Sequence, residues 1–171
     1  SLNAVREATV LSTCNRVEVY CVCEHLHHAT DVVNEVFETS TVGEDINIHD
    51  FLYVKTDGEA VKHLFRVTSS LDALVVGENQ IVGQVKDAFE SAREEQALGQ
   101  HLNRLFHKAL YVAKRIKTET EIGRGNVSVG SAAVMLARKI FDTLKDHDVL
   151  LVGAGEMGET VARSLSSGEK T

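Results

Sequence analysis

The sequence predicts an α/β fold in two parts: a small mixed sheet with helices packed on it, and then a strand–turn–helix unit. Three observations support this prediction. Two runs rich in β-branched residues open the chain, at residues 8–11 and 17–22. Segments with apolar residues at helical spacing fill most of the middle. Near the end, the apolar run 148–152 leads directly into a glycine-rich turn.

The first part contains the elements of one domain. Residues 8–11 and 17–22 are expected to be strands joined by a short polar loop, and residues 50–55 are a third strand candidate. Apolar residues recur on one face of four further segments. The expected helices cover residues 26–37, 58–69, 80–96 and 101–118.

The second part follows a glycine-rich loop at residues 122–126, which predicts a domain boundary. We expect one domain over residues 1–124 and a second unit over residues 125–171. The second unit should contain a helix over 128–144, a buried strand at 148–152 and a helix that starts near residue 155. A parallel sheet needs more strands than this, so the unit is expected to be the truncated start of an α/β domain.

Composition excludes several classes of protein. The net charge is -7 and the pI about 5.6, so a general basic surface for nucleic acid is absent and any RNA contact must be local. Three cysteines do not make a disulfide framework, and an odd count without a signal peptide predicts a reduced, cytoplasmic protein. No apolar run approaches the roughly 20 residues that span a bilayer.

Cys14 is the first candidate for chemistry. It lies on the polar loop between the first two strands, and Arg16 follows two residues later. A nearby cation lowers the pKa of a thiol, and the thiolate is the nucleophilic form. The alternative is a small buried hydrophobic residue, because free cysteine is often buried.

The residues around Cys14 resemble a known family. The string VLSTCNRVEVY, residues 10–20, is similar to the catalytic-loop signature of glutamyl-tRNA reductases. Further strings similar to that family follow in the same order along nearly the whole chain. They are HLFRV (63–67), LD (71–72), GENQIVGQVK (77–86), AKRIKTET (113–120), VSV (127–129) and VLLVGAGEMG (149–158).

The resemblance implies an enzyme. The family forms a thioester between its loop cysteine and the glutamyl group carried on tRNA, which makes Cys14 the expected nucleophile. NADPH then reduces the thioester to glutamate-1-semialdehyde, an early step of tetrapyrrole biosynthesis, and no metal is required. Glutamyl-tRNA is the expected partner, with glutamate-1-semialdehyde aminomutase as a second candidate. The resemblance also implies a homodimer for the full-length protein and a monomer for this chain alone.

The resemblance carries further residues into the site. Arg16 matches a residue that grips the substrate, and a guanidinium suits bidentate binding of a carboxylate; the alternative is a surface arginine in a strand ladder. Thr13 matches a residue that contacts the glutamyl group, although its hydroxyl could equally fasten the loop backbone. His63 matches a histidine that orients substrate or assists proton transfer; the alternative is an exposed helix histidine. Glu78 and Gln84 are expected to bind substrate.

Two positions depart from the family pattern. Ala73 stands where the family usually has a serine that contacts the substrate. Asn79 stands where the family commonly has proline, which affects only the rigidity of a turn.

The string GAGEMG, residues 153–158, predicts a Rossmann-type nucleotide site. It matches Gly-x-Gly-x-x-Gly, follows a predicted strand and opens a predicted helix. The expected cofactor-binding residues are Gly153, Ala154, Gly155 and Gly158, and Glu156 is expected to face solvent. A structural glycine turn is the alternative, and NADPH rather than NADH is implied by the resemblance alone.

Two other groups of residues are candidates for a function, a possible metal site and a possible RNA-binding face. Cysteine and histidine gather in one short segment, at Cys21, Cys23, His25, His27 and His28. Zinc is disfavoured there, because strand residues two apart are separated by about 6.6 Å and the histidines should begin a surface helix.

The helix 101–118 has basic residues and no acidic ones, with Arg104, Lys108 and Arg115 on one side and Tyr111 between them. An RNA contact and a solvated helix face explain this equally well.

The main rival to an enzyme is a non-catalytic glutamyl-tRNA-binding or regulatory module on the same scaffold. Cys14, Arg16 and His63 are all present, which argues against that reading. An unrelated dehydrogenase sharing only the glycine-rich turn is the second rival, and the cysteine string argues against it.

Overall fold

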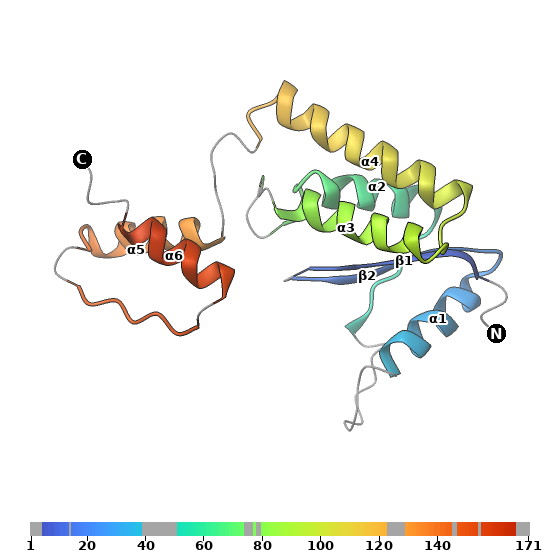
Figure 1. Cartoon of the computed structure of the whole chain (residues 1–171), viewed down its shortest axis with the longest axis horizontal. Coiled ribbons are helices and arrows are strands. Elements are labelled where there is room, and N and C mark those ends of the chain that lie inside the picture. Colours follow the sequence, from blue (N-terminus) through green and yellow to red (C-terminus); the bar gives the residue numbers. More distant parts are fainter. Residues whose placement is uncertain are drawn as a thin grey trace.

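The computed structural model describes residues 5–13, 15–38, 51–73, 77, 80–122, 129–144, 147–153 and 155–166. Two strands and six helices lie in this part of the chain (Figure 1). They are β1 (Val5–Ser12), β2 (Val17–Cys23), α1 (Leu26–Glu38), α2 (Asp57–Thr68), α3 (Gln80–Glu94), α4 (Gln100–Glu119), α5 (Val129–Phe141) and α6 (Glu156–Ser166).

The two strands form an antiparallel hairpin whose inner face is buried. Leu11 pairs with Glu18, and Thr9 pairs with Tyr20. All four of these side chains are buried, because alternate residues of a strand point to the same side of the sheet. The helices α2, α3 and α4 cover this face, and α1 lies on the other side of the hairpin (Figure 1).

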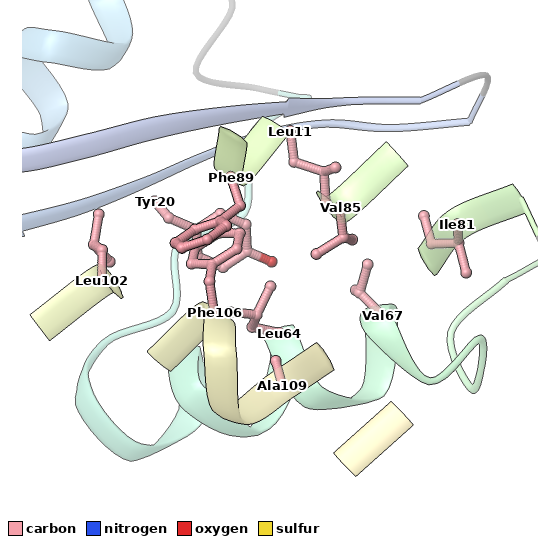
Figure 2. Packing of buried hydrophobic residues seen from close by; sticks show 10 residues of the cluster. All are labelled: Leu11, Tyr20, Leu64, Val67, Ile81, Val85, Phe89, Leu102, Phe106 and Ala109. Carbon is pink, nitrogen blue, oxygen red and sulfur yellow. The ribbon is translucent and has the colours of Figure 1, made fainter. Parts of the chain in front are cut away.

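The core lies between the hairpin and these three helices (Figure 2). Its centre is Phe106 of α4, which stacks on Phe89 of α3 with the ring centroids 5.9 Å apart. Tyr20 of β2 meets Phe106 edge to face at 5.6 Å. Aromatic pairs in these geometries add stability beyond the area that they bury. The packing fixes α2, which carries His63, against the end of the hairpin.

The predicted fold class is confirmed: helices pack on a small sheet. Every predicted helix is present, with bounds close to those expected. The sheet has two antiparallel strands in the part of the chain that the structure describes, so its expected mixed character is not seen there.

Two predicted strands are wrong. Residues 51–56 are irregular, and Phe51 and Val54 are 75% and 65% exposed. Residues 147–153 likewise form no ladder, and Leu150 and Val152 are each 88% exposed. Both segments have strand-like composition, but a strand also needs a partner for its backbone hydrogen bonds, and neither has one among the described residues.

The helices α5 and α6 pack on each other, to one side of the other elements (Figure 1). Gly130 marks their close approach, since a Cβ there would lie 2.9 Å from Cγ2 of Val161. The predicted boundary near residue 124 lies outside the described residues and stays a prediction. None of the described helices has the length and apolar character needed to cross a membrane.

Candidate active site

Thr13 closes the loop that carries Cys14. Its backbone N–H donates to the carbonyl oxygen of Arg16 at 2.9 Å. Its Oγ1 accepts from the backbone N–H of Asn15 at 3.2 Å and of Arg16 at 3.1 Å. The hydroxyl therefore fastens the loop backbone, which is the alternative that the sequence left open. Cys14 itself lies outside the described residues, and a substrate contact by Thr13 stays a prediction.

Arg16 connects this loop to the segment after α2. Its Nη1 lies 2.9 Å from Oδ2 of Asp72 and 3.1 Å from Oε1 of Glu18, and its Nη2 donates to the backbone carbonyl of Asp72. Burial favours the neutral guanidine, but these hydrogen bonds outweigh it and raise the pKa of Arg16. Arg16 lies outside both strands, so it is not part of a strand ladder.

Glu18 is the centre of a cluster of polar side chains, called the catalytic cluster below, which also contains Arg16, Tyr20, Tyr53 and His63. Its side chain is 7% exposed and accepts hydrogen bonds from Arg16, from Nε2 of His63 at 2.9 Å, and from the hydroxyls of Tyr20 and Tyr53. Burial raises the pKa of a carboxyl, but the hydrogen bonds from Tyr20, Tyr53 and His63 outweigh it and lower the pKa of Glu18. A buried carboxylate is stable only with such partners, so Glu18 is ionised.

The two tyrosines remain phenols. Burial raises the pKa of Tyr20 and of Tyr53, and the adjacent Glu18 carboxylate raises both further. Each hydroxyl therefore keeps its proton and donates a hydrogen bond to the Glu18 carboxylate. The cluster consequently holds one buried carboxylate against one guanidinium, one imidazole and two neutral donors.

His63 faces this cluster from α2. Its side chain is 12% exposed, which excludes the exposed helix histidine that the sequence left open. An ionised carboxylate only accepts hydrogen bonds, so Nε2, which bonds to Glu18, carries a proton. The Tyr53 hydroxyl lies 3.3 Å from the same nitrogen. The arrangement orients the ring and leaves Nδ1 as its second nitrogen for chemistry.

A cavity of about 420 Å³ lies beside the cluster. One wall is a single face of α2, whose contributing residues follow the helical spacing i, i+3, i+4 and i+7. The segments just before and just after α2 complete it. The lining residues are Tyr53, Lys55, Glu59, Lys62, His63, Arg66 and Asp72. The volume is typical of a small-ligand site.

Gln84 on α3 has a buried side-chain oxygen, Oε1, without a hydrogen-bond partner among the described residues. Buried polar atoms are nearly always paired, so this acceptor is suited to a donor on a ligand. Glu78, the other expected substrate contact on this part of the chain, lies outside the described residues. Asn79, one of the two departures from the family pattern, also lies outside the described residues, and Ala73 is half-buried just after Asp72.

The three glycines of the turn at residues 153–158 differ in backbone conformation and in surroundings. Gly153 has φ of +114°, in the region that favours glycine. A Cβ on Gly158 would lie 2.8 Å from the carbonyl oxygen of Gly153, so the start of α6 packs tightly on the turn. A Cβ on Gly155 would meet nothing within 4 Å. These features match the roles of the glycines in the Gly-x-Gly-x-x-Gly pattern. The first glycine allows the tight turn, the second leaves room for the backbone to approach a pyrophosphate, and the third allows close packing of the helix. Ala154 lies outside the described residues.

The cysteine and histidine segment is not arranged as a metal site. Burial and the neighbouring Cys23 raise the pKa of Cys21 to about 11, so Cys21 is a thiol rather than a thiolate ligand. No three His, Cys, Asp or Glu side chains of the described residues come together to hold a metal ion. His25 and His27 are exposed at and just before the start of α1, as predicted. His28 was predicted to be on the surface too, but it is half-buried and its Nδ1 is buried.

The basic face of α4 is partly occupied. Nε and Nη2 of Arg115 bind both oxygens of Glu119, at 2.7 and 2.9 Å. The ammonium of Lys108 lies 5.2 Å from the ring centre of Tyr111. The predicted RNA contact on this helix remains a prediction, with fewer free cations than the sequence suggested.

The structure thus brings together two expected residues, Arg16 and His63, through a residue that the sequence analysis missed, Glu18. Thr13 joins them through the backbone of Arg16. A signal for Glu18 was available, because a charged residue at an inward-facing strand position needs buried partners. Tyr53, Asp72 and the lysines of the cavity carried no such signal.

Comparison with known proteins gives matches over nearly the whole chain. The family model described as glutamyl-tRNAGlu reductase, N-terminal domain, matches residues 1–120, and the shikimate / quinate 5-dehydrogenase model matches residues 135–171. The glutamyl-tRNA reductase of Aquifex aeolicus is 47% identical over 94% of this chain and 39% of its own length. That of Stenotrophomonas maltophilia (strain R551-3) is 47% identical over 96% of this chain and 37% of its own.

A solved structure agrees with these matches. The glutamyl-tRNA reductase from Methanopyrus kandleri matches with 43% identity and a TM-score of 0.62. The match covers 95% of this chain and 38% of that one. The chain therefore spans somewhat more than a third of the length of these relatives.

Proposed function

The chain belongs to the glutamyl-tRNA reductase family, and on that premise we propose that it is the catalytic part of an enzyme that reduces the glutamyl group of glutamyl-tRNA, at an early step of tetrapyrrole formation. The observation that carries the proposal is the cluster behind the cysteine loop, in which buried Glu18 holds both Arg16 and His63. A binding module has no need of an oriented imidazole beside a cysteine loop.

The proposed first step is acyl transfer to Cys14. The thiolate attacks the ester carbonyl of glutamyl-tRNA, a C–S bond forms, and the C–O bond to the terminal ribose breaks. The leaving ribose oxygen takes up a proton and departs with the tRNA. NADPH would supply the hydride that reduces the thioester, releasing glutamate-1-semialdehyde and the free thiol. No metal is needed, because a thiolate is a good leaving group.

His63 is proposed to manage the proton of the leaving group. Glu18 fixes the proton on Nε2, so Nδ1 is the nitrogen that exchanges a proton with substrate. The Glu18–His63 pair resembles in its logic other carboxylate–imidazole pairs, where the carboxylate sets the tautomer and the orientation of the ring.

Four more residues are proposed to hold the glutamyl group. Arg16 follows Cys14 by two residues in the sequence and suits the free carboxylate of the substrate, sharing its donors with Asp72 and Glu18. The unpartnered Oε1 of Gln84 suits the ammonium group of the substrate. The roles of Thr13 and Glu78 rest on the family resemblance.

The glycine-rich turn is proposed to bind the pyrophosphate of NADPH. Gly155 leaves room for the backbone to approach, and the N-terminus of α6 favours the negative charge. A complete cofactor site needs neighbouring parallel strands, which residues 147–153 lack among the described residues. We therefore expect this chain to bind NADPH weakly.

Assembly and location are proposals from the family. The full-length protein is proposed to be a cytoplasmic homodimer, and this chain alone a monomer. Glutamate-1-semialdehyde aminomutase is the proposed partner that receives the product, because an aldehyde intermediate benefits from direct transfer.

Trapping tests the proposed function without the rest of the cofactor domain. The chain is incubated with glutamyl-tRNA and its intact mass is measured. We expect a covalent adduct with the mass of one glutamyl group, accompanied by release of deacylated tRNA. Binding of glutamyl-tRNA without an adduct would instead favour the non-catalytic module.

A further inference from the structure

We propose that the cavity along α2 binds phosphate groups of the single-stranded acceptor end of the RNA, through Lys55, Lys62 and Arg66. The inference rests on the proposed function and deepens it, because it assigns a place to the leaving group rather than to the glutamyl group. It also places the nucleic-acid contact on α2, on the side of the molecule that carries the catalytic cluster.

The charges around the cavity favour an anion. Three cations and two carboxylates line it, in a chain whose net charge is -7. Neither Lys55 nor Lys62 has a carboxylate within ion-pair distance among the described residues, and the Lys55 ammonium lies 5.5 Å from the ring centre of Tyr53. The Asp72 carboxylate is already hydrogen-bonded to Arg16 at 2.9 Å and lies 3.8 Å from Arg66, so two lysines stand against the Glu59 carboxylate. The free positive charge of the wall therefore exceeds its free negative charge.

The cavity is continuous with the catalytic cluster. His63 and Asp72 belong to both: His63 bonds to Glu18, and Asp72 bonds to Arg16, two residues from Cys14. An aminoacyl ester is carried on the terminal ribose of a tRNA, and the nearest phosphodiester is one ribose away. A substrate with its ester at the cysteine loop would bring this phosphate next to the cavity wall.

The two lysines lie on the two chain segments that border the cavity. Lys62 precedes His63 on the same face of α2, and Lys55 lies on the segment before the helix. A cavity of about 420 Å³ holds part of a nucleotide rather than a duplex. Single-stranded RNA is bound in this way, by cations along the backbone with an aromatic ring close by, and Tyr53 provides that ring.

The α4 face is the weaker candidate. On α4, Arg115 pairs with Glu119 and Lys108 lies over the ring of Tyr111. Lys55 and Arg66 of the cavity have comparable neighbours, the Tyr53 ring at 5.5 Å and Asp72 at 3.8 Å, so the presence of partners does not separate the two faces. The α2 cations differ in that they line a cavity which shares His63 and Asp72 with the cluster around Glu18.

The experiment compares the Lys55→Ala/Lys62→Ala double variant with the unchanged chain in single-turnover release of tRNA from glutamyl-tRNA. Both lysines are exposed, so the fold should be unaffected, and thermal unfolding checks this. We expect the apparent Kd for glutamyl-tRNA to rise about tenfold. Two lost contacts to a single strand should reduce the slope of log affinity against log salt by about 1.4. Lys139→Ala, an exposed lysine on α5, is the matched control and should change neither quantity.

A second substrate separates phosphate from carboxylate. Glutamyl-adenosine carries the same ester and the same glutamyl group but no phosphate, so the double variant should react with it at the rate of the unchanged chain. An equal loss with both substrates would overturn the proposal and assign the cavity to the glutamyl carboxylate. An unchanged salt slope with glutamyl-tRNA would also overturn it, since the lysines would then be merely solvated.

The same proteins separate this inference from the proposed function. If the unchanged chain forms no adduct with either substrate, the proposed function fails. The phosphate site is then tested by fluorescence anisotropy with a labelled RNA hairpin ending in unpaired CCA. Weaker, less salt-dependent binding by the double variant would still support the site, and equal binding would refute it.

Discussion

Replacing Glu18 with glutamine removes the charge at the centre of the catalytic cluster and keeps the size of the side chain. Glu18 accepts from four donors, those of Arg16, Tyr20, Tyr53 and His63. A glutamine oxygen can accept from about two of them, and its NH2 group would face the others. The substitution therefore leaves donors unpaired and one buried guanidinium with less compensation.

The magnitude follows from these partners. A hydrogen bond to a charged group contributes about 1.5–3 kcal/mol, and breaking a buried ion pair costs about 3–5 kcal/mol. Because Arg16 keeps Asp72, we expect the lower end, a loss of about 3 kcal/mol in the free energy of unfolding. Urea denaturation of the variant measures this loss. The acylation rate should fall about a hundredfold, the lower end of what a positioned acid or base contributes.

Glu7→Gln is the matched control. Glu7 is also a buried carboxylate on the hairpin, but it caps the N-terminus of α4, accepting from the backbone N–H groups of His101 at 3.0 Å and Leu102 at 2.7 Å. The Glu7→Gln variant should lose about 1–2 kcal/mol in the free energy of unfolding, but its acylation rate should equal that of the unchanged chain. The assay is the rate of adduct formation as a function of pH. If Glu18→Gln loses stability but acylates like Glu7→Gln at every pH, Glu18 only supports the fold and its proposed role is refuted.

Four further outcomes are expected. Cys14→Ser should abolish adduct formation, whereas Cys21→Ser should affect stability at most. At neutral pH Cys21 should also react slowly with iodoacetamide, because its pKa is raised to about 11. The pKa of Glu7 is lowered in the folded protein, because hydrogen bonds from the backbone of α4 and from His101 outweigh the effect of burial. The stabilisation by Glu7 is therefore present above its unfolded-state pKa of about 4.3 and is lost as the pH falls. In Glu7→Gln the free energy of unfolding, measured by urea titration, should therefore depend less on pH below that value. Charge reversal of Lys108 and Arg115 should raise the apparent Kd for glutamyl-tRNA only if α4 also touches RNA, and an unchanged salt slope would make that face merely solvated. Calorimetry should detect little NADPH binding to this chain, and a micromolar Kd would show a complete cofactor site.

Local pattern was sufficient to predict the helices. Apolar residues at helical spacing bury themselves wherever another element is available, and α3 and α4 do so through Phe89 and Phe106. Local pattern failed for residues 51–56 and 147–153, where strand-like composition has no ladder partner among the described residues. The composition of a segment shows what it can form, whereas its neighbours in space decide what it does form.

Some residues of the site could likewise be predicted from local sequence, and others could not. The cysteine string pointed to Thr13 and Arg16, and the glycine spacing pointed to the turn at Gly153. The sequence could not show that Asp72, 56 residues from Arg16, would bind its guanidinium, or that Tyr53 and His63 would meet at Glu18. These contacts depend on α2 docking beside the end of the hairpin, which is a property of the packed core.

The most direct test of the account is the location of the glutamyl group after reaction with radiolabelled glutamyl-tRNA. The chain is digested, and the labelled peptide is sequenced by mass spectrometry. The account predicts one label per chain, on Cys14, released by hydroxylamine as expected of a thioester and lost when the tRNA is first deacylated. A label on Cys21 or Cys23, or tight binding of glutamyl-tRNA with no label on the chain, would contradict it.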